Sequence, residues 1–262
     1  MKKVLLSSVA LLGLTVGAFA ADLPRRTVAP APAPAPVMVA PAFTWTGFYV
    51  GVSGGYLWND VDAGLAATGG ATAGLLATAP TDIPGSVGFE SDGFLVGGTI
   101  GGNVQFGMFV AGIEADLSFV DNDSSASFVT AGGLATTTFS SEMNAFGTVR
   151  GRLGLAFDRF MIYGTGGLAF ADIQDTVTVA PRAPAVFTPF SGQGSDDWRV
   201  GWTAGVGGEF AITNNLTFKV EYLHYEFDSE TVRATGAAAT DFVDYNVEHS
   251  GELIRGGINF KF

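Results

Sequence analysis

The most constraining feature of this sequence is the regular alternation of apolar and polar residues in its last segment, residues 249–262 (HSGELIRGGINFKF). One face of this segment carries Ile254, Ile258, Phe260 and Phe262, and the other carries Arg255, Asn259 and Lys261. A period of two is typical of a β-strand, because successive side chains point to opposite sides. The segment therefore predicts a strand with one apolar and one polar face.

Seven earlier segments alternate in the same way. With the last one, the predicted strands are residues 45–58, 92–105, 109–120, 140–157, 160–172, 197–212, 216–228 and 249–262. Short connections such as 106–108 predict antiparallel hairpins. They alternate with long segments that lack clear periodicity and are predicted to be loops: residues 59–88, 121–137, 173–196 and 229–248. The predicted fold class is all-β, an eight-stranded antiparallel up-and-down transmembrane β-barrel.

Composition excludes several other classes. The chain has no cysteine, which rules out disulfides and thiolate metal sites. No apolar run after the first twenty residues approaches the roughly 18 residues that a membrane helix requires. The formal net charge of -12 argues against a nucleic-acid partner.

The N-terminal part divides into two segments that precede the barrel, which is predicted over residues 43–262. Residues 1–20 combine Lys2 and Lys3 with an apolar stretch and small residues before position 21, the pattern of a secretory signal peptide. Residues 21–42 are rich in proline and alanine and predict an extended periplasmic tail. Such a tail is a semi-rigid linker or a segment that reaches the cell wall.

Alternation alone does not distinguish a membrane barrel from a soluble barrel with its apolar face inward. Three features favour the membrane. The polar faces carry charges of both signs on six strands, aromatic residues gather near both ends of the predicted strands, and a signal peptide is combined with a terminal Phe262. Two aromatic girdles are expected at the two interfaces of a membrane barrel.

Charged residues on the polar faces are predicted to point into the barrel. They are Glu114, Asp116, Arg150, Arg152, Arg199, Glu209, Lys219, Glu221, Arg255 and Lys261. Because an isolated buried charge is very unfavourable, we expect a network of salt bridges. In it, the arginines of segment 140–157 lie near Glu114 or Asp116, and Arg255 lies near Glu221. The alternative is a charged selectivity ring in a narrow water path.

The sequence resembles the alphaproteobacterial family of small outer-membrane barrels, known as the porin or outer-membrane immunogenic protein family, with an architecture similar to that of OmpA or OmpX. The resemblance rests on the leader followed by ADLP, on WTGFYVGVSGGY, VAGIEADLSF and VRGRLGLAF, and on the ending GGINFKF. It implies location in the outer membrane of a Gram-negative bacterium, with both termini in the periplasm. It also implies that Phe260 and Phe262 form a signal for the barrel assembly machinery, and that Ala21 is a candidate for attachment to peptidoglycan.

No catalytic, cofactor or metal site is predicted. His249, Ser250 and Glu252 superficially suggest a hydrolase triad, but adjacent residues of a strand point to opposite sides, which prevents the first pairing. Acidic residues in the predicted loops are either a solvated surface or a place where divalent cations bridge to lipopolysaccharide. The expected function is structural and surface-interacting, with outer-membrane lipid, lipopolysaccharide, host molecules or phage as partners. The alternative is a narrow channel for ions or small solutes.

Overall fold

The computed structural model describes residues 43–70, 85–121, 123–129, 135–182, 189–194, 198–238 and 240–262. The predicted signal peptide (1–20) and tail (21–42) lie outside the described residues. In this described part, no helix has the length and apolar character needed to cross a membrane.

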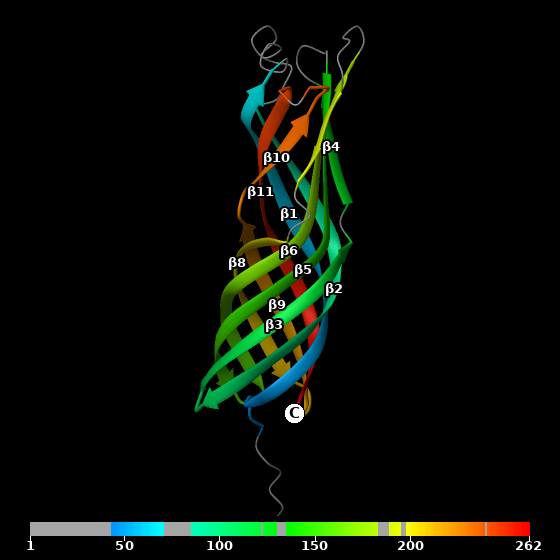
Figure 1. The fold of residues 1–262 in the computed structure, drawn as a ribbon. Helices are drawn as coiled ribbons and strands as arrows, with labels where there is room; N and C mark the ends of the chain where they lie inside the picture. The colour runs from blue at the N-terminus through cyan, green and yellow to red at the C-terminus, as the bar shows by residue number, and fades with distance from the viewer. Residues whose placement is uncertain are drawn as a thin grey trace, which may run out of the picture. The chain divides into compact units, whose positions relative to one another are not determined.

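The described chain is built of antiparallel β-strands (Figure 1). They are β1 (Gly47–Gly69), β2 (Ser86–Phe106), β3 (Phe109–Asp121), β4 (Asp123–Val129), β5 (Ala135–Phe157), β6 (Phe160–Pro181), β7 (Phe190–Gln193), β8 (Arg199–Ala211), β9 (Leu216–Phe227), β10 (Glu230–Thr235) and β11 (Phe242–Lys261). Tight turns join β2 to β3, β5 to β6 and β8 to β9, as the short connections predict. In one of them, Asp158 takes a positive φ of 53°, which Asp tolerates better than most residues.

Eight of these strands close into a ring in the order β1-β2-β3-β5-β6-β8-β9-β11, and β11 returns to β1. The closing ladder runs from the pair Tyr49 and Lys261 to the pair Gly69 and Phe242. Closure pairs the backbone groups of both edges, which a barrel in lipid requires. The prediction of an eight-stranded antiparallel barrel is confirmed.

The predicted long loops are wrong in large part, because the strands continue through them. β1 runs on to Gly69 and β6 to Pro181, and β4, β7 and β10 lie within segments that were predicted as loops. β1 has 23 residues, whereas a tilted strand crosses a membrane with about 9–11. The barrel therefore rises well beyond one face of a membrane. We call the upper part, formed by β4, β7, β10 and the adjoining ends of β1, β2, β5, β6 and β11, the extension.

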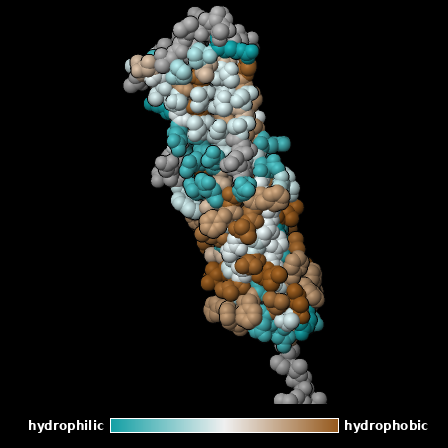
Figure 2. All heavy atoms as spheres, turned by 90° about the vertical axis from the view of Figure 1, so that its right-hand side faces the viewer, coloured by the Kyte–Doolittle hydropathy of each residue, from teal (hydrophilic) through white to brown (hydrophobic). Residues whose placement is uncertain are grey.

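The apolar surface marks the part of the barrel that meets lipid. Figure 2 shows hydrophobic side chains gathered in a band over one half of the face in view, and polar side chains over the other half. Along β1, Val52 and Trp58 point outward and are exposed, whereas the outward residues that follow are Asp60 and Asp62. The lipid-facing band thus ends near Trp58, where the extension begins. We call the part of the barrel that carries this band the membrane section.

Candidate functional site

Eight ionisable side chains from five strands meet inside the membrane section of the barrel. We call them the ion network: Glu114 and Asp116 of β3, Arg150 and Arg152 of β5, Glu209 of β8, Lys219 and Glu221 of β9, and Arg255 of β11. All eight are buried. The set contains four carboxylates and four cations, so its formal charges cancel.

Asp116 is bound by two arginines of this network. Arg255 binds its two carboxylate oxygens with two nitrogens at 2.8 and 3.0 Å, a bidentate geometry that favours arginine over lysine. The same guanidinium donates to Glu221 at 2.8 Å. Arg150 donates to Glu114 at 2.6 Å and to Asp116 at 3.1 Å. The structure therefore brings together both pairs of partners that the sequence predicts.

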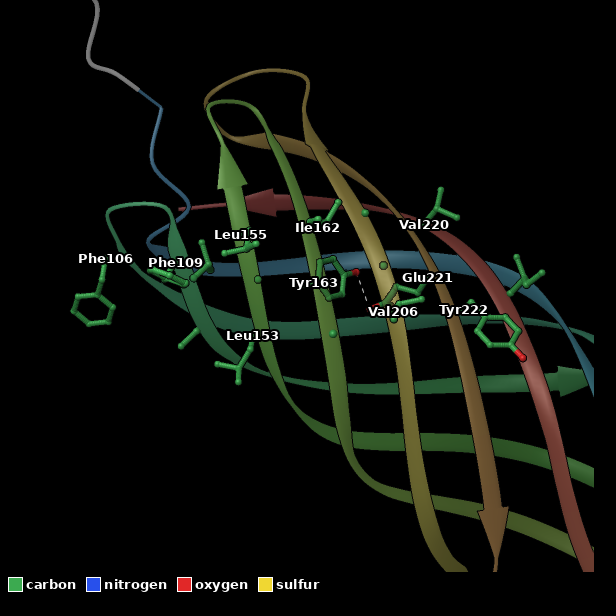
Figure 3. A pocket seen from close by; sticks show the side chains of 17 residues that line it. Phe106, Phe109, Leu153, Leu155, Ile162, Tyr163, Val206, Val220, Glu221 and Tyr222 are labelled. Carbon is green, nitrogen blue, oxygen red and sulfur yellow. Dashed lines mark hydrogen bonds between the residues drawn. The ribbon is translucent and has the colours of Figure 1, made fainter.

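Two tyrosines complete the network, and the sequence analysis did not assign them to it. The Tyr49 hydroxyl donates to Glu114 at 2.8 Å and accepts from Arg152 at 2.9 Å. The Tyr163 hydroxyl donates to Glu221 at 2.8 Å, a bond drawn in Figure 3. The guanidinium of Arg152 lies 3.9 Å from the centre of the Tyr163 ring, close enough for a cation–π contact. In the sequence, both tyrosines alternate with lipid-facing residues and so lie on the polar face of their strands. This position could have predicted that they point into the barrel.

Lys261 and Arg199 do not belong to the ion network. Lys261 lies at the turn end of the barrel, where its amine donates to the backbone oxygens of Thr44 and Thr46. Arg199 lies beyond the other end of the network, next to Asp175 and Glu230. Alternation correctly separates two faces of a strand, but it does not give the height of a residue along the barrel, and this is why the predicted set was too large.

Apolar layers border the ion network on both sides. Along β5 the inward residues include Ala156, then Arg152, Arg150 and Thr148, then Phe146. At the turn end, Ala156 packs with Trp45, Val110, Met161, Tyr163 and Ala211, which we call the lower layer. Beyond the network, an upper layer is formed by Leu57, Leu95, Met143, Phe146, Ala169, Ala171, Ile173, Leu223, Tyr225, Phe227 and Leu253.

A second, smaller polar cluster lies above the upper layer, where the membrane section meets the extension. Asp175 contacts Arg199 and lies 3.0 Å from the Nε2 atom of His249. Arg199 also pairs with Glu230 at 2.7 Å. Burial raises the pKa of Asp175, but the hydrogen bond and charge of His249 and the charge of Arg199 outweigh burial and bring this pKa below its ordinary value. We call Asp175, Arg199, Glu230 and His249 the seam cluster.

A hollow on the barrel surface is lined mainly by apolar side chains that point outward (Figure 3). Leu153 and Val206, for example, are exposed within the lipid-facing band. Tyr163 and Glu221 line it from the inner side of the wall. The hollow is therefore mainly apolar and lies within the lipid-facing band, with Glu221 of the ion network in its lining.

Comparison with known proteins identifies the chain. The sequence profile of the outer membrane protein beta-barrel domain matches residues 7–248. The chain belongs to this family. The 31 kDa outer-membrane immunogenic protein of Brucella melitensis biotype 1 is 33% identical over the full length of both chains. The 22 kDa outer membrane protein of Rhizobium leguminosarum bv. viciae is 28% identical over 86% of this chain and 81% of its own.

The similarity to solved structures is weaker than the similarity to these sequence relatives. The outer membrane protein OprG from Pseudomonas aeruginosa is 12% identical and superposes with a TM-score of 0.45 over 83% of this chain and 96% of its own. The family and its relatives confirm the resemblance seen in the sequence and place the protein in the outer membrane of a Gram-negative bacterium. In outer-membrane barrels the short turns ordinarily face the periplasm, and in that orientation the extension would project outside the cell.

Proposed function

We propose that the protein is a closed barrel with a structural role in the envelope, and that its extension interacts with other surfaces outside the cell. The observation that carries the closed-barrel part is the filled interior of the membrane section. An ion network without net charge lies between two apolar layers, and these three layers draw side chains from all parts of the ring.

The chemistry of these layers opposes conduction. Ions do not enter an apolar layer without losing their hydration, which is very unfavourable. Phe146 and Leu223 are buried in the upper layer, and Trp45 is buried in the lower one. The ions of the network are already bound to one another, so a permeating ion would have to compete with charge-assisted hydrogen bonds. The narrow channel is therefore the less favoured alternative.

Conductance in planar bilayers tests the closed barrel. We expect the purified wild-type protein to be silent, and we expect the combined variant Trp45→Ala, Phe146→Ala, Leu223→Ala to conduct. A matched control cuts three lipid-facing side chains of the same types, Trp202→Ala, Phe119→Ala and Leu153→Ala, and should stay silent. Reproducible conductance steps from the wild type would overturn the proposal in favour of a channel.

The surface role rests on the extension and on the relatives, whose printed names call them immunogenic. Host molecules, phage and the sugars of lipopolysaccharide are the candidate partners. Since the chain has no cysteine, single cysteines can report exposure on intact cells. A membrane-impermeant maleimide should label Ser127→Cys in β4 and should not label Asn214→Cys in the β8–β9 turn. Labelling of the turn with no labelling of β4 would reverse the assigned orientation.

Two further partners follow from the chain ends. We expect the barrel assembly machinery to recognise Phe260 and Phe262, so deletion of Phe262 should lower the amount of folded protein in the outer membrane. Attachment of Ala21 to peptidoglycan would connect the barrel to the wall. Mass spectrometry of wall digests should then find peptides that begin at Ala21, and their absence would remove this part of the proposal.

A further inference from the structure

The wall of the extension is open between β2 and β4. β2 pairs with β3 from Phe94 to Phe106, but over residues 86–90 its partner among the described residues is β1 alone. β4 follows β3 after one residue and pairs only with β5, whose other side is occupied by β6. No ladder joins β2 to β4 in the part of the chain that the structure describes. Each of these two strands therefore has a free edge on the side of the other.

A free strand edge is a binding surface for another strand. Every second residue directs its backbone N–H and C=O groups away from the strand already paired, and these groups can hydrogen-bond to an extended peptide. β4 has seven residues, which lies within the usual length of a strand. The backbone at this opening thus fits a short extended segment of polypeptide.

The apolar core of the extension is incompletely covered at the same opening. Phe89 of β2 and Phe128 of β4 pack against this core but are only half-buried, whereas Val87 and Phe139 beside them are buried. An added strand would direct every second side chain toward this core. Apolar side chains at those positions would remove Phe89 and Phe128 from water, which is favourable. One face of the fitting segment is therefore apolar.

The outer side of the β2 edge is acidic. Glu90 and Asp92 point outward and are exposed, and so are Asp60 and Asp62 on the adjoining β1. Asp60 lies directly opposite Glu90, an arrangement of like charges that is unfavourable without a compensating cation. Two hollows of the outer surface share these two carboxylates in their linings. Because β1, β2 and β4 contain no lysine or arginine, the outer face of the fitting segment is basic.

The chain itself does not supply this complement near the opening. The segments that follow β1 and β4, residues 71–84 and 130–134, contain no lysine or arginine. A second copy of the chain has the same formal net charge of -12 and would present the same carboxylates. Like charges across an interface are unfavourable. The basic segment therefore comes from a different protein.

We propose that the free edge of β2 in the extension binds an extended peptide segment of another protein in which apolar and basic residues alternate. The segment adds as a strand beside β2. Its apolar side chains cover Phe89 and Phe128, and its basic side chains lie beside Glu90 and Asp92. This inference rests on the surface role proposed for the extension and gives the chemistry of one partner.

A synthetic peptide of alternating lysine and valine, with the length of β4, tests the proposal. The full chain is placed in nanodiscs of phosphatidylcholine, a lipid without net charge, and binding is followed by fluorescence anisotropy of the labelled peptide. Two control peptides have the same charge: one carries its lysines and valines in two blocks, and the other is N-methylated along its backbone. Both should bind at least about tenfold more weakly than the alternating peptide. Equal binding of either control would overturn the proposal, since it would show attraction without strand addition.

A charge swap at the edge identifies the surface that the peptide contacts. Glu90→Lys combined with Asp92→Lys should weaken binding of the lysine peptide about tenfold, because attractive pairs become repulsive. The same variant should gain binding of a peptide of alternating glutamate and valine. Glu226→Lys combined with Glu248→Lys is the matched control, because these exposed carboxylates belong to β9 and β11, which do not adjoin the edge. An equal loss in both variants would reject the site.

Hydrogen exchange on the wild type tests the proposal without any variant. Residues 86–90 and 123–129 should exchange more slowly when the lysine peptide is bound, and β10 should not change. Protection of residues 86–90 already present without peptide would mean that the edge is occupied, by the chain itself in a monomer or by a second copy in a dimer. Light scattering separates these two cases, and both contradict the proposal. If Ser127→Cys is labelled on intact cells but no peptide binds, this inference fails while the surface role stands.

Discussion

The membrane section and the extension share five strands, β1, β2, β5, β6 and β11, but have opposite surfaces. In the membrane section, Val52 and Ile113 face outward while Glu114 and Arg150 are buried. In the extension, Asp60 and Asp62 face outward, and the interior is an apolar core that includes Val61, Phe139, Val177, Val243 and Tyr245. In the strands that run through both parts, the hydrophobic side therefore reverses at the edge of the membrane, because the apolar side must face lipid below this edge and the interior above it.

The contrast extends to the buried charges. The ion network is neutral, has no histidine and connects five strands. The seam cluster is smaller and includes a histidine. This difference gives the membrane section an interior in which opposite charges cancel, whereas a histidine is among the buried polar groups that join the extension to it. The predictions below test this division.

The largest effect is expected from removing one member of the ion network. Arg255→Ala takes away the partner that Asp116 and Glu221 share, and leaves buried carboxylates without compensation. Breaking a buried pair in this way costs about 3–5 kcal/mol. Urea unfolding of the barrel in bilayers should show this loss for the whole ring. Leu153→Ala on the lipid-facing side is the control, and a similar loss in both variants would contradict the assigned role of the network.

A comparable but local effect is expected in the core of the extension. Phe139 is buried in β5, and its ring lies 5.0 Å from that of Tyr245 and 6.5 Å from that of Phe128. Phe139→Ala should destabilise this region by about 3–5 kcal/mol, the usual range for a buried phenylalanine. Limited proteolysis should then cut the extension while the membrane section stays intact. If the membrane section were digested at the same rate, the two parts would form one cooperative unit.

The sequence predicted the strands of the membrane section better than those of the extension. In the membrane section, apolar residues alternate with glycines and charged residues. Glu114, Arg150 and Arg255 fall on the side that the structure turns inward. In the extension the inner side includes small residues such as Ala63, Ala135 and Ala234, and many outer residues are serine or threonine. The contrast between the two sides is then weak, and these segments were predicted to be loops.

The ion network shows a second limit on what the sequence can predict. Each strand pattern assigns a side chain to a face, but the pairing register between strands decides which charges meet. Glu114 lies opposite Arg150 across β3 and β5, and Glu221 lies opposite Arg255 across β9 and β11. Those pairs could be predicted from the sequence, because their strands were predicted to be neighbours in the barrel. The separation of Arg199 from the network, and its contact with Asp175 of a predicted loop, required the three-dimensional register.

A smaller effect is expected when the seam cluster is exposed to acid. Folding favours the charged form of Asp175, because its pKa is below the ordinary value of about 3.9. Its contribution to stability is therefore complete above that value, and is lost as pH falls through the lower pKa of the folded state. Proteolysis of the extension by an acid-active protease should accelerate below about pH 4 in the wild type. Asp175→Asn should flatten this acceleration, while an unchanged profile would assign it to other carboxylates.

The smallest effect is expected from a pair of the extension in which Arg233 is exposed and Asp244 is buried. The guanidinium of Arg233 donates two hydrogen bonds, both of 2.7 Å, to the two carboxylate oxygens of Asp244, which is a bidentate geometry. Arg233 also lies over the ring of Phe242. The side chain of Arg233 is 57% exposed, however, so water screens the attraction. Arg233→Ala should change stability far less than Phe139→Ala does, and less still in high salt, because water and ions screen an exposed charge. If this variant loosened the extension as much as Phe139→Ala, surface pairing rather than the apolar core would hold the extension together, and the comparison between the two parts would have to be redrawn.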